Sequence, residues 1–540
     1  MALIANFDIN RLPLGNPEFS AIREENDIYV DKTDLIYKIA NQRSPIFFSR
    51  PRRFGKSLLI NTLSSLFSDG LERFQGLAIE KLWRDTTYQV VRLDFSGLAD
   101  KNPQLFKEDL GETLIKKFKL EGIVSQRGVS GVRSPDRILE EIGEKLKNKS
   151  VVLLIDEYDA PLTHHLHNYD ELQEIMSILN SFYSIVKQYT GKFRLIFITG
   201  VTRVSHVSIF SAFNNLVDLS LDEEYNSLLG FTQDNIRRYF DQYVENSAQI
   251  LNMGKDEVYH RLEQYYDGFQ FALDAKETVY NPWSILSFFK LSKNGFRNYW
   301  FETGGTSSII MQYLKVSDTF DFLDYNKRNA YVETYELSLK YEIGDIPQNI
   351  LLYQAGYLTI RNDEGNAYLT PPNTEVEESL LMLYLMENEI APSCELVQKM
   401  KKLSRDIDSR NLYSIVDMFN DILNECVSSS SNIFNDERSV RDIIYAALIK
   451  IPSVQKIKER ETVKGRSDLE LVTAKTCMVI EFKRTNPRRG KEASLNKALE
   501  QLKINRYGSL FSQTHALYRV GMVISTEKKM ILHDFCKEVS

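Results

Sequence analysis

The first 225 residues alternate between short apolar runs and segments in which apolar residues recur at helical spacing. In the segments between the apolar runs, such as 58–67, apolar residues recur every three or four positions, as they do in amphipathic helices. Each run has the length and character of a strand that is buried on both faces. This alternation predicts an α/β domain over 1–225, with a parallel sheet that has helices on both faces. The four apolar runs are 44–49, 89–95, 150–155 and 193–198.

Beyond residue 225 the pattern becomes mostly helical. Residues 351–373 are an exception, because they predict the end of a helix followed by a small β-hairpin with Asn362-Asp-Glu-Gly365 at its turn. Aromatic residues are dense at 265–271, 280–283 and 299–304. Such rings can stack on bases, but packing in a core is their more frequent role. We therefore expect a mostly helical lid or winged-helix-like region over 226–405, without chemistry of its own.

The last part of the chain returns to strands. Residues 460–472 predict a turn and a strand, 476–483 a second strand, and 493–507 a helix. The short serine run at 428–431 is interpreted as a loop near a domain border. We therefore expect a further α/β domain over 406–540.

The composition is that of an ordinary soluble protein, with 43% hydrophobic and 26% charged residues. The net charge of −7 argues against a chain that is basic throughout, so contact with nucleic acid requires a local basic patch. No apolar run reaches the roughly 18 residues of a membrane-spanning helix, and no membrane partner is expected. Four scattered cysteines without C-x-x-C spacing favour a reducing, cytoplasmic location over a zinc site.

The first chemical signal follows the first apolar run. Arg50-Pro-Arg-Arg-Phe-Gly-Lys-Ser57 lies between that run and a helical segment, which is the setting of a phosphate-binding loop. Lys56 would reach the β- and γ-phosphates, and the Ser57 hydroxyl would hold Mg²⁺. Arg50 stands where the usual pattern has its first glycine, so a basic loop that opens an ordinary helix is the alternative. The residues predicted to contact the nucleotide here are Arg53, Phe54, Gly55, Lys56, Ser57 and Leu58.

Later apolar runs end in groups that suit the same site. Asp156 and Glu157 follow the third run, Thr199 ends the fourth, and Arg203 comes shortly after it. Ligands bind at the C-terminal edge of such sheets. There Asp156 would hold Mg²⁺, Glu157 would polarise the attacking water, Thr199 would sense the γ-phosphate, and Arg203 would contact the nucleotide. Residues 29–41 would cover the base, with a plain capped helix as the alternative.

A second constellation lies in the C-terminal part. Glu481 and Lys483 share one face of a strand because side chains alternate, and a neighbouring strand can bring Asp468 beside Glu481. The two carboxylates would bind Mg²⁺ or Mn²⁺, and Lys483 would orient a water or neutralise charge, as phosphodiester cleavage requires. Glu470 shares the face of Asp468, so spacing alone leaves the choice between them open. The alternative is that Asp468, Glu481 and Lys483 are merely surface charges on a hairpin, although the apolar residues 478–480 favour a buried strand.

Further residues extend this second site. Glu437, near the start of a helix, is either a third acid or a residue that interacts with the helix dipole. Gln501 would reach the metal, and Tyr507 would reach the substrate backbone. The basic run 483–491 suits a phosphate backbone.

Both halves resemble one known pattern, that of bacterial AAA-ATPase-like proteins with a C-terminal PD-(D/E)xK nuclease-like domain. That family itself carries Arg-Pro-Arg-Arg-Phe-Gly-Lys-Ser, so Arg50 is a family trait. Ser467 stands where tyrosine is common, which is a mild departure. The matching residues are Tyr29-Val-Asp-Lys-Thr33, Arg50 to Ser57, Ile155-Asp-Glu-Tyr-Asp159, Thr199-Gly-Val-Thr-Arg203, Tyr266-Asp-Gly-Phe269, Tyr280-Asn-Pro282, Gly465-Arg-Ser-Asp468, Glu481-Phe-Lys483, Gln501 and Tyr507.

The resemblance implies a protein that binds and hydrolyses ATP and thereby regulates or drives a Mg²⁺-dependent nuclease for DNA, with RNA less favoured. The alternative is an NTP-dependent switch whose C-terminal domain binds nucleic acid or protein without cutting, against which the intact Asp468, Glu481 and Lys483 argue. A helicase-like motor is a weaker reading, because no second motor domain follows the first. A homo-oligomer is a further expectation, with Arg52 or Arg203 reaching a neighbour's nucleotide.

Overall fold

The computed structural model divides the chain into two compact units, Met1–Ser379 and Leu380–Ser540. The first unit contains both the predicted ATPase domain and most of the predicted helical region, so the border at 225 and the three-part division stay predictions. The residues described are 8–124, 134–166, 168–203, 213, 215–301, 330–339, 341, 346–363, 365–387, 393–426, 434, 436–448, 451, 454–458, 461–462, 465–485, 490–505, 507–508 and 514–539.

A five-stranded sheet forms the centre of the first unit, with the order β2-β3-β4-β1-β5. All neighbouring strands are parallel, so their carboxyl ends meet at one edge. Strand β4 lies between β1 and β3, which places the ends of all three next to one another. The strands are β1 (Ile46–Ser49), β2 (Gln89–Asp94), β3 (Val151–Asp156), β4 (Phe193–Gly200) and β5 (Val217–Asp218).

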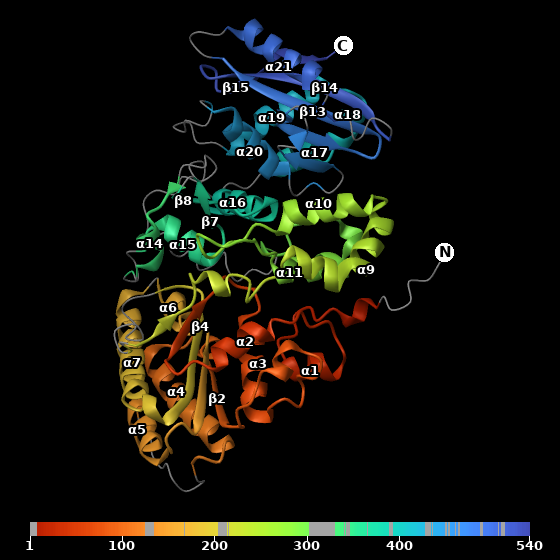
Figure 1. Ribbon diagram of the computed structural model, residues 1–540. Coiled ribbons are helices and arrows are strands. Elements are labelled where there is room, and N and C mark those ends of the chain that lie inside the picture. The colour runs from red at the N-terminus through yellow and green to blue at the C-terminus, as the bar shows by residue number, and fades with distance from the viewer. Residues whose placement is uncertain are drawn as a thin grey trace. The chain divides into compact units, whose positions relative to one another are not determined.

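Helices cover both faces of this sheet, as predicted (Figure 1). On one side α4 (Pro103–Leu120), α5 (Pro135–Lys145) and α7 (Tyr169–Gln188) enclose a core of buried aliphatic and aromatic side chains from β2, β3 and β4. Figure 1 shows α1 (Phe19–Glu24), α2 (Thr33–Ala40) and α3 (Lys56–Asp69) together on the other side. The short helix α6 (Ala160–His164) follows β3.

The rest of the first unit is mostly helical and has an aromatic core. Tyr266, Tyr280 and Phe288 are each 0% exposed and belong to a buried core, against which the partly buried Trp283 packs. The predicted hairpin is confirmed as β7 (Thr359–Asp363) and β8 (Asn366–Thr370), which β6 (Ala330–Tyr331) joins in a small sheet. The helices are α9 (Gln233–Leu251), α10 (Lys255–Tyr266), α11 (Pro282–Lys290), α14 (Thr334–Ser338), α15 (Gln348–Ala355) and α16 (Thr374–Glu387), the last of which extends into the second unit.

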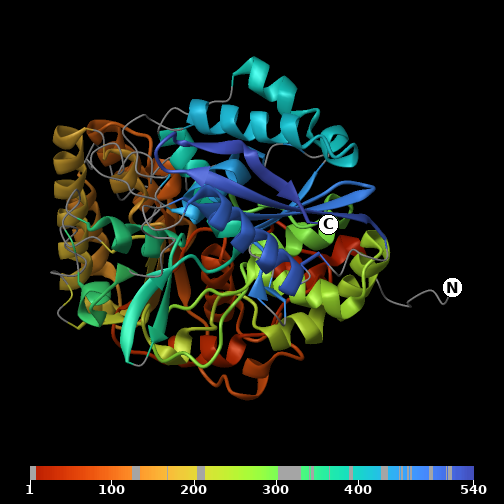
Figure 2. The same ribbon diagram turned by 90° about the horizontal axis from the view of Figure 1, so that it is seen from above.

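The second unit is built on a mixed sheet with the order β15-β14-β13-β12-β9, in which only β13 and β14 run parallel. Figure 2 shows the blue helix α21 (Lys491–Asn505) on one side of these strands and cyan helices on the other. The remaining helices are α17 (Cys394–Met400), α18 (Leu403–Asp408), α19 (Leu412–Cys426) and α20 (Glu437–Leu448). The strands are β9 (Gln455–Lys458), β12 (Leu469–Val472), β13 (Thr476–Arg484), β14 (Ala516–Ser525) and β15 (Met530–Glu538), besides the short pair β10 (Glu461–Thr462) and β11 (Gly465–Arg466).

The fold class is therefore the one predicted: a parallel sheet with helices on both faces, a mostly helical middle with a hairpin, and a C-terminal α/β unit. No helix within the described ranges is long and apolar enough to cross a membrane. The serine run at 428–431 and residues 486–489 of the basic run lie outside the described residues.

Candidate functional site

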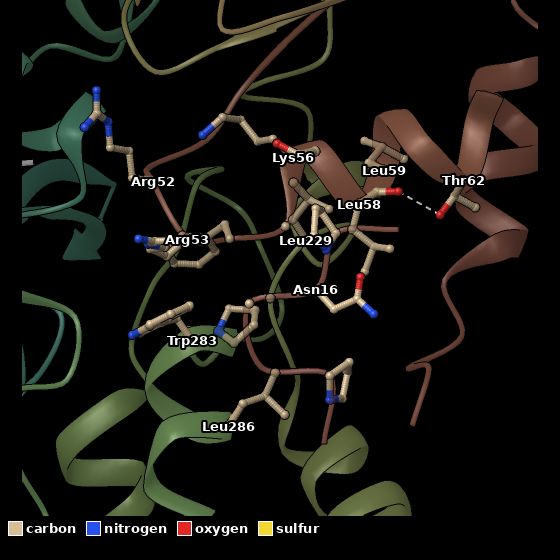
Figure 3. A pocket seen from close by; sticks show the side chains of 18 of the residues that line it. Asn16, Arg52, Arg53, Lys56, Leu58, Leu59, Thr62, Leu229, Trp283 and Leu286 are labelled. Atoms are coloured by element: carbon tan, nitrogen blue, oxygen red, sulfur yellow. Dashed lines mark hydrogen bonds between the residues drawn. The ribbon is translucent and has the colours of Figure 1, made fainter. Parts of the chain in front are cut away.

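The predicted phosphate-binding loop joins the end of β1 to the start of α3. Gly55 caps α3 in the left-handed region, with φ 98° and ψ 22°, and a side chain there would be strained. Arg53 also has a positive φ of 71°. Its guanidinium carbon lies 4.3 Å from the ring centre of Trp283 on α11, and Figure 3 shows the two side chains next to each other. The first N–H groups of α3 follow this loop, and such unpaired N–H groups at a helix start are a place where phosphate can bind.

Lys56 is held inside this loop. Its side chain is buried, and Nζ donates hydrogen bonds to the carbonyl oxygens of Arg50 at 2.9 Å and Pro51 at 3.0 Å. Burial lowers the pKa of Lys56, while the carboxylates of Glu157 and Asp156 raise it. The direct hydrogen bonds of this ammonium group go to neutral carbonyls, which a phosphate oxygen can replace.

Asp156 lies beside the start of α3, at the end of β3. A hydrogen bond with the Ser57 side chain lowers the pKa of Asp156 against the larger effect of burial, which raises it. A hydroxyl and a carboxylate in contact are hard oxygen ligands of the type that Mg²⁺ takes beside a nucleotide. The two residues therefore fit the predicted metal site. Glu157 follows with φ 48° and lines the neighbouring cavity, and burial raises its pKa as well.

Thr199 occupies the end of β4, next to Phe48 of β1 in the strand register. Its side chain is 0% exposed, and Oγ1 has no hydrogen-bond partner among the described residues. An unpartnered buried hydroxyl is costly and is a feature that a ligand can satisfy. Asp159 fixes the segment that follows, since its carboxylate accepts hydrogen bonds from the N–H groups of Val201 and Thr202.

A cavity of about 690 Å³ lies beside the phosphate loop; Lys56, Ser57 and Glu157 line it, whereas Asp156 and Thr199 are not among its described lining residues. The phosphate loop, Glu157 and the short helix α6 line one part of it. The other part is apolar and is formed by the N-terminal segment around Tyr29, by residues 228–231 and by Trp283 and Leu286 of α11 (Figure 3). A cavity with a polar phosphate end and an apolar end has the chemistry that a nucleotide needs. The sequence indicated the N-terminal segment but not α11, because no local pattern links residue 283 to the loop.

The structure does not bring Arg203 to this cavity. Its guanidinium donates hydrogen bonds to the Asp218 carboxylate at 2.6 Å and to the Leu337 carbonyl at 2.7 Å. Arg203 is 5% exposed and does not line the nucleotide cavity. Phe54 is also buried, and its ring packs edge-on against Phe269 at 4.9 Å, so its side chain anchors the loop.

The second predicted site assembles at the end of β13. Asp468 precedes β12, and its Oδ2 accepts a hydrogen bond of 2.8 Å from the Phe482 N–H. Lys483 Nζ donates to Glu481 Oε1 at 2.6 Å and to the Phe482 carbonyl at 2.9 Å. The antiparallel register pairs Leu469 with Ile480, which by continuation sets Asp468 opposite Glu481. Two carboxylates and an ammonium group therefore meet at one point, as the strand pattern predicted.

Electrostatics in this second site favour a bound cation. Burial and the Asp468 carboxylate raise the pKa of Glu481, and burial also raises the pKa of Asp468. Burial alone would lower the pKa of Lys483, but the carboxylates of Glu481 and Asp468 outweigh it, and the pKa is raised. Glu481 Oε2 is buried and has no hydrogen-bond partner in the described part of the chain. This carboxylate pair fits Mg²⁺, although no cluster of three or more His, Cys, Asp or Glu residues able to hold a metal occurs within the described ranges.

Glu437 is brought to the same point by α20. Its Oε1 accepts a hydrogen bond of 2.7 Å from the Arg484 N–H, and its Oε2 lies 3.8 Å from Lys483 Nζ. One turn further along α20, Arg441 is buried in an ion pair with Asp442, with Nε 2.8 Å from Oδ1. Burial raises the pKa of Asp468, and the charges of Lys483 and Arg441 oppose that rise. Sequence reasoning missed Arg441, although its spacing of four residues from Glu437 places both on one helix face.

Two further predictions are not supported by the geometry. Gln501 donates its hydrogen bond to the Tyr507 hydroxyl at 3.4 Å, and no contact with Glu481 or Asp468 is described. Tyr507 is 0% exposed and packs in a small core with Val479 and Leu502, so it does not face a substrate. Glu470 is also fully buried, and its Oε1 accepts a hydrogen bond from the Ser467 hydroxyl. It pairs with Val479 in the register, whereas Asp468 lies opposite Glu481, which favours Asp468.

Comparison with known proteins identifies both halves. A family model described as predicted AAA-ATPase matches residues 13–210, and a model of the PD-(D/E)XK nuclease superfamily matches residues 435–534. A protein of Azotobacter chroococcum mcd 1, described as an uncharacterized protein in the vnfD 5'region, is 32% identical over 388 residues. The aligned part covers 70% of this chain and 71% of that protein. The chain therefore belongs to the family of predicted AAA-ATPases that carry a C-terminal domain of the PD-(D/E)XK nuclease superfamily.

Proposed function

We propose that the protein binds and hydrolyses ATP in its first unit and thereby regulates or drives a Mg²⁺-dependent nuclease in its second unit. The substrate proposed is DNA, with RNA less favoured. The observation that carries the nuclease assignment is the meeting of Asp468, Glu481 and Lys483 at one buried strand end, where Lys483 bonds to Glu481 and where both Asp468 and Lys483 bond to the main chain of Phe482.

In the first unit, each proposed role rests on a described contact. Lys56 would exchange its two carbonyl partners for phosphate oxygens. Ser57 and Asp156, already joined by a hydrogen bond, would hold Mg²⁺. Glu157 lines the cavity and would take a proton from the attacking water, and the unpartnered Thr199 hydroxyl would bind the γ-phosphate.

In the second unit, Asp468 and Glu481 would hold Mg²⁺ or Mn²⁺, with Glu437 as a third acid beside Lys483. The metal, when bound, polarises the phosphate and lowers the pKa of a bound water. Lys483 would orient that water or neutralise charge that develops on the phosphate. The bond between Glu437 and the Arg484 N–H holds the start of α20 against the end of β13, so that the acids stay together.

We also propose a cellular location and an oligomeric state. The four cysteines are all free thiols, which supports a reducing cytoplasm. For a homo-oligomer, Arg52 is the better candidate to reach a neighbour's nucleotide, because Arg203 is buried in its ion pair.

The test of the nuclease is cleavage of single- and double-stranded DNA and RNA in Mg²⁺ or Mn²⁺ by the full chain. We expect wild type to cut, and Asp468→Asn and Lys483→Ala to lose at least about 100-fold in rate. The matched controls are Asp534→Asn and Lys475→Ala, which change exposed residues of the same unit and should cut at the wild-type rate. Cleavage that survives both site substitutions would refute the assignment. No cleavage by wild type, together with retained binding of nucleic acid, would favour a switch that does not cut.

A further inference from the structure

A second, much smaller cavity lies in the first unit, beside the phosphate loop. Its volume is about 20 Å³, and it lies where the end of β1, the segment after β4, the segment after β5 and helix α15 meet. Arg50, Arg203 and Gln354 all line it. Arg50 replaces the first glycine of the usual loop pattern, and Arg203 is the arginine that the nucleotide cavity does not use. Neither residue has a role in the function proposed above.

Three hydrogen-bond donors are left over around this cavity. Nε of Arg50, Nε of Arg203 and Nε2 of Gln354 are buried and have no partner among the described residues. The three side chains are 2%, 5% and 6% exposed, respectively, so bulk water does not reach them freely. An unpaired buried donor is destabilising, and an acceptor in the cavity that these three residues line would relieve it.

The charges around the cavity are unbalanced. Arg50 donates its Nη hydrogen bonds to the carbonyls of Ser49, Ser220 and Tyr225, and its guanidinium lies between the rings of Phe48 and Phe271, 4.3 and 4.1 Å from their centres. Among the described residues, Asp218 supplies the carboxylate that bonds to Arg203, at 2.6 Å. The described contacts therefore give two buried guanidinium groups and one carboxylate, so a further negative charge would stabilise the two arginines. Burial and the positive charge of Arg203 both lower the pKa of Arg50, to about 9.

The size of the cavity limits the ligand. A particle the size of one water molecule needs roughly 10–15 Å³. A cavity of about 20 Å³ therefore holds one such particle and is too small for phosphate, sulfate or a carboxylate. A water molecule can accept from two donors at most, so it leaves one of the three unpaired, and it brings no negative charge. A monatomic anion only accepts, and its charge offsets the excess.

We propose that this cavity binds one halide ion, chloride in the cell, held by Arg50, Arg203 and Gln354. The ion ties the start of the phosphate loop to α15. The two are already in close contact, since a Cβ on Gly356, the residue after α15, would lie 2.6 Å from Pro51. The anion is therefore a structural ligand of the ATPase unit, separate from the nucleotide site.

The direct test uses crystals of the full chain grown with bromide in place of chloride. Anomalous diffraction should show a bromide peak between the Nε atoms of Arg50 and Arg203. In solution, the melting temperature in chloride should exceed that in gluconate at equal ionic strength by about 2 °C or more.

The variant Gln354→Glu places a carboxylate where the ion would lie, and we expect its melting temperature to become independent of chloride. Gln348→Glu makes the same change on the same helix but does not line the cavity, and it should keep the chloride dependence. If Gln354→Glu does not fold, the bromide peak in the wild-type protein decides. No bromide peak in the cavity, no chloride dependence in wild type, or an undiminished dependence in a folded Gln354→Glu variant would overturn the proposal.

Discussion

Lys56 and Lys483 are both buried ammonium groups, but they are stabilised in different ways. Lys56 bonds to two neutral carbonyls of its own loop, whereas Lys483 bonds to the Glu481 carboxylate and lies near that of Glu437. Because the two carbonyls are neutral, little electrostatic attraction is lost when the Lys56 ammonium group exchanges them for phosphate oxygens, as the proposed ATP binding requires. Lys483 is fixed by carboxylates, which suits a residue that orients other groups and stays in place.

Lys56→Ala should weaken ATP binding about tenfold to 100-fold, because it removes charge-assisted hydrogen bonds worth about 1.5–3 kcal/mol. Calorimetric titration with ATP and Mg²⁺ measures the dissociation constant. The control is Lys38→Ala, since Lys38 lies outside the cavity with a side chain that is 47% exposed. An unchanged dissociation constant for a folded Lys56→Ala protein would show that the loop does not hold phosphates.

Glu437→Gln tests whether this residue belongs to the nuclease site or only to the start of its helix. The glutamine carbonyl can still accept the bond from the Arg484 N–H, but the charge beside Lys483 is lost. We expect cleavage to slow about tenfold or more, with the midpoint of metal activation moved to higher Mg²⁺. Glu395→Gln is the matched control, because Glu395 is also acidic and in the first turn of its helix, α17. Equal effects of the two substitutions would reduce Glu437 to a helix-dipole role.

At the scale of elements, the helical part of the first unit is held together by a buried acid on α16. Glu375 is 0% exposed, and its carboxylate accepts hydrogen bonds from the Ser284 hydroxyl at 2.6 Å and the Trp300 N–H at 2.9 Å. Trp300 in turn donates to the carbonyl of Arg52 in the phosphate loop at 3.4 Å. A chain of contacts therefore runs from α16 through Trp300 to the loop.

Stability of this part should depend on pH through Glu375. Burial, with a smaller contribution from Glu378, raises its pKa from 4.5 to about 8. The folded chain thus keeps a proton that the unfolded chain releases, and the free energy of unfolding should fall as pH rises from about 4.5 to about 8, by at most about 1.4 kcal/mol per pH unit. Glu375→Gln should flatten this slope in urea unfolding between pH 5.5 and 8.5, whereas Glu277→Gln at the surface should not. Equal slopes in wild type and Glu375→Gln would contradict the account.

Elements whose signal is local were predicted well from the sequence. The loop between β1 and α3, the hairpin of β7 and β8, and the meeting of Asp468 with Glu481 all follow from periodicity within about 20 residues. Two predicted residues are engaged by other partners. Arg203 bonds to Asp218 and to Leu337, 134 residues away, which no local pattern reveals. Gln501 bonds to Tyr507, only six residues away, which packs in a core with Leu502 of the same helix. The apolar end of the nucleotide cavity likewise combines remote segments that no local pattern connects.

At the scale of the whole molecule, the chain forms two compact units, and each contains one of the two candidate sites. Each candidate site has its own acids and its own lysine, so residues of one can be substituted without changing the other. That separation allows the proposed coupling to be tested, because a nucleotide-site variant leaves every residue of the nuclease site unchanged.

The most direct test of this account is the rate of DNA cleavage in Mg²⁺ with and without ATP, compared between wild type and Lys56→Ala. If ATP regulates or drives the nuclease, ATP should change the wild-type rate at least about tenfold and leave the Lys56→Ala rate unchanged, while Lys483→Ala should not cut in either condition. A wild-type rate that is the same with and without ATP, at ATP concentrations where binding is demonstrated, would contradict the central claim that the two sites act together.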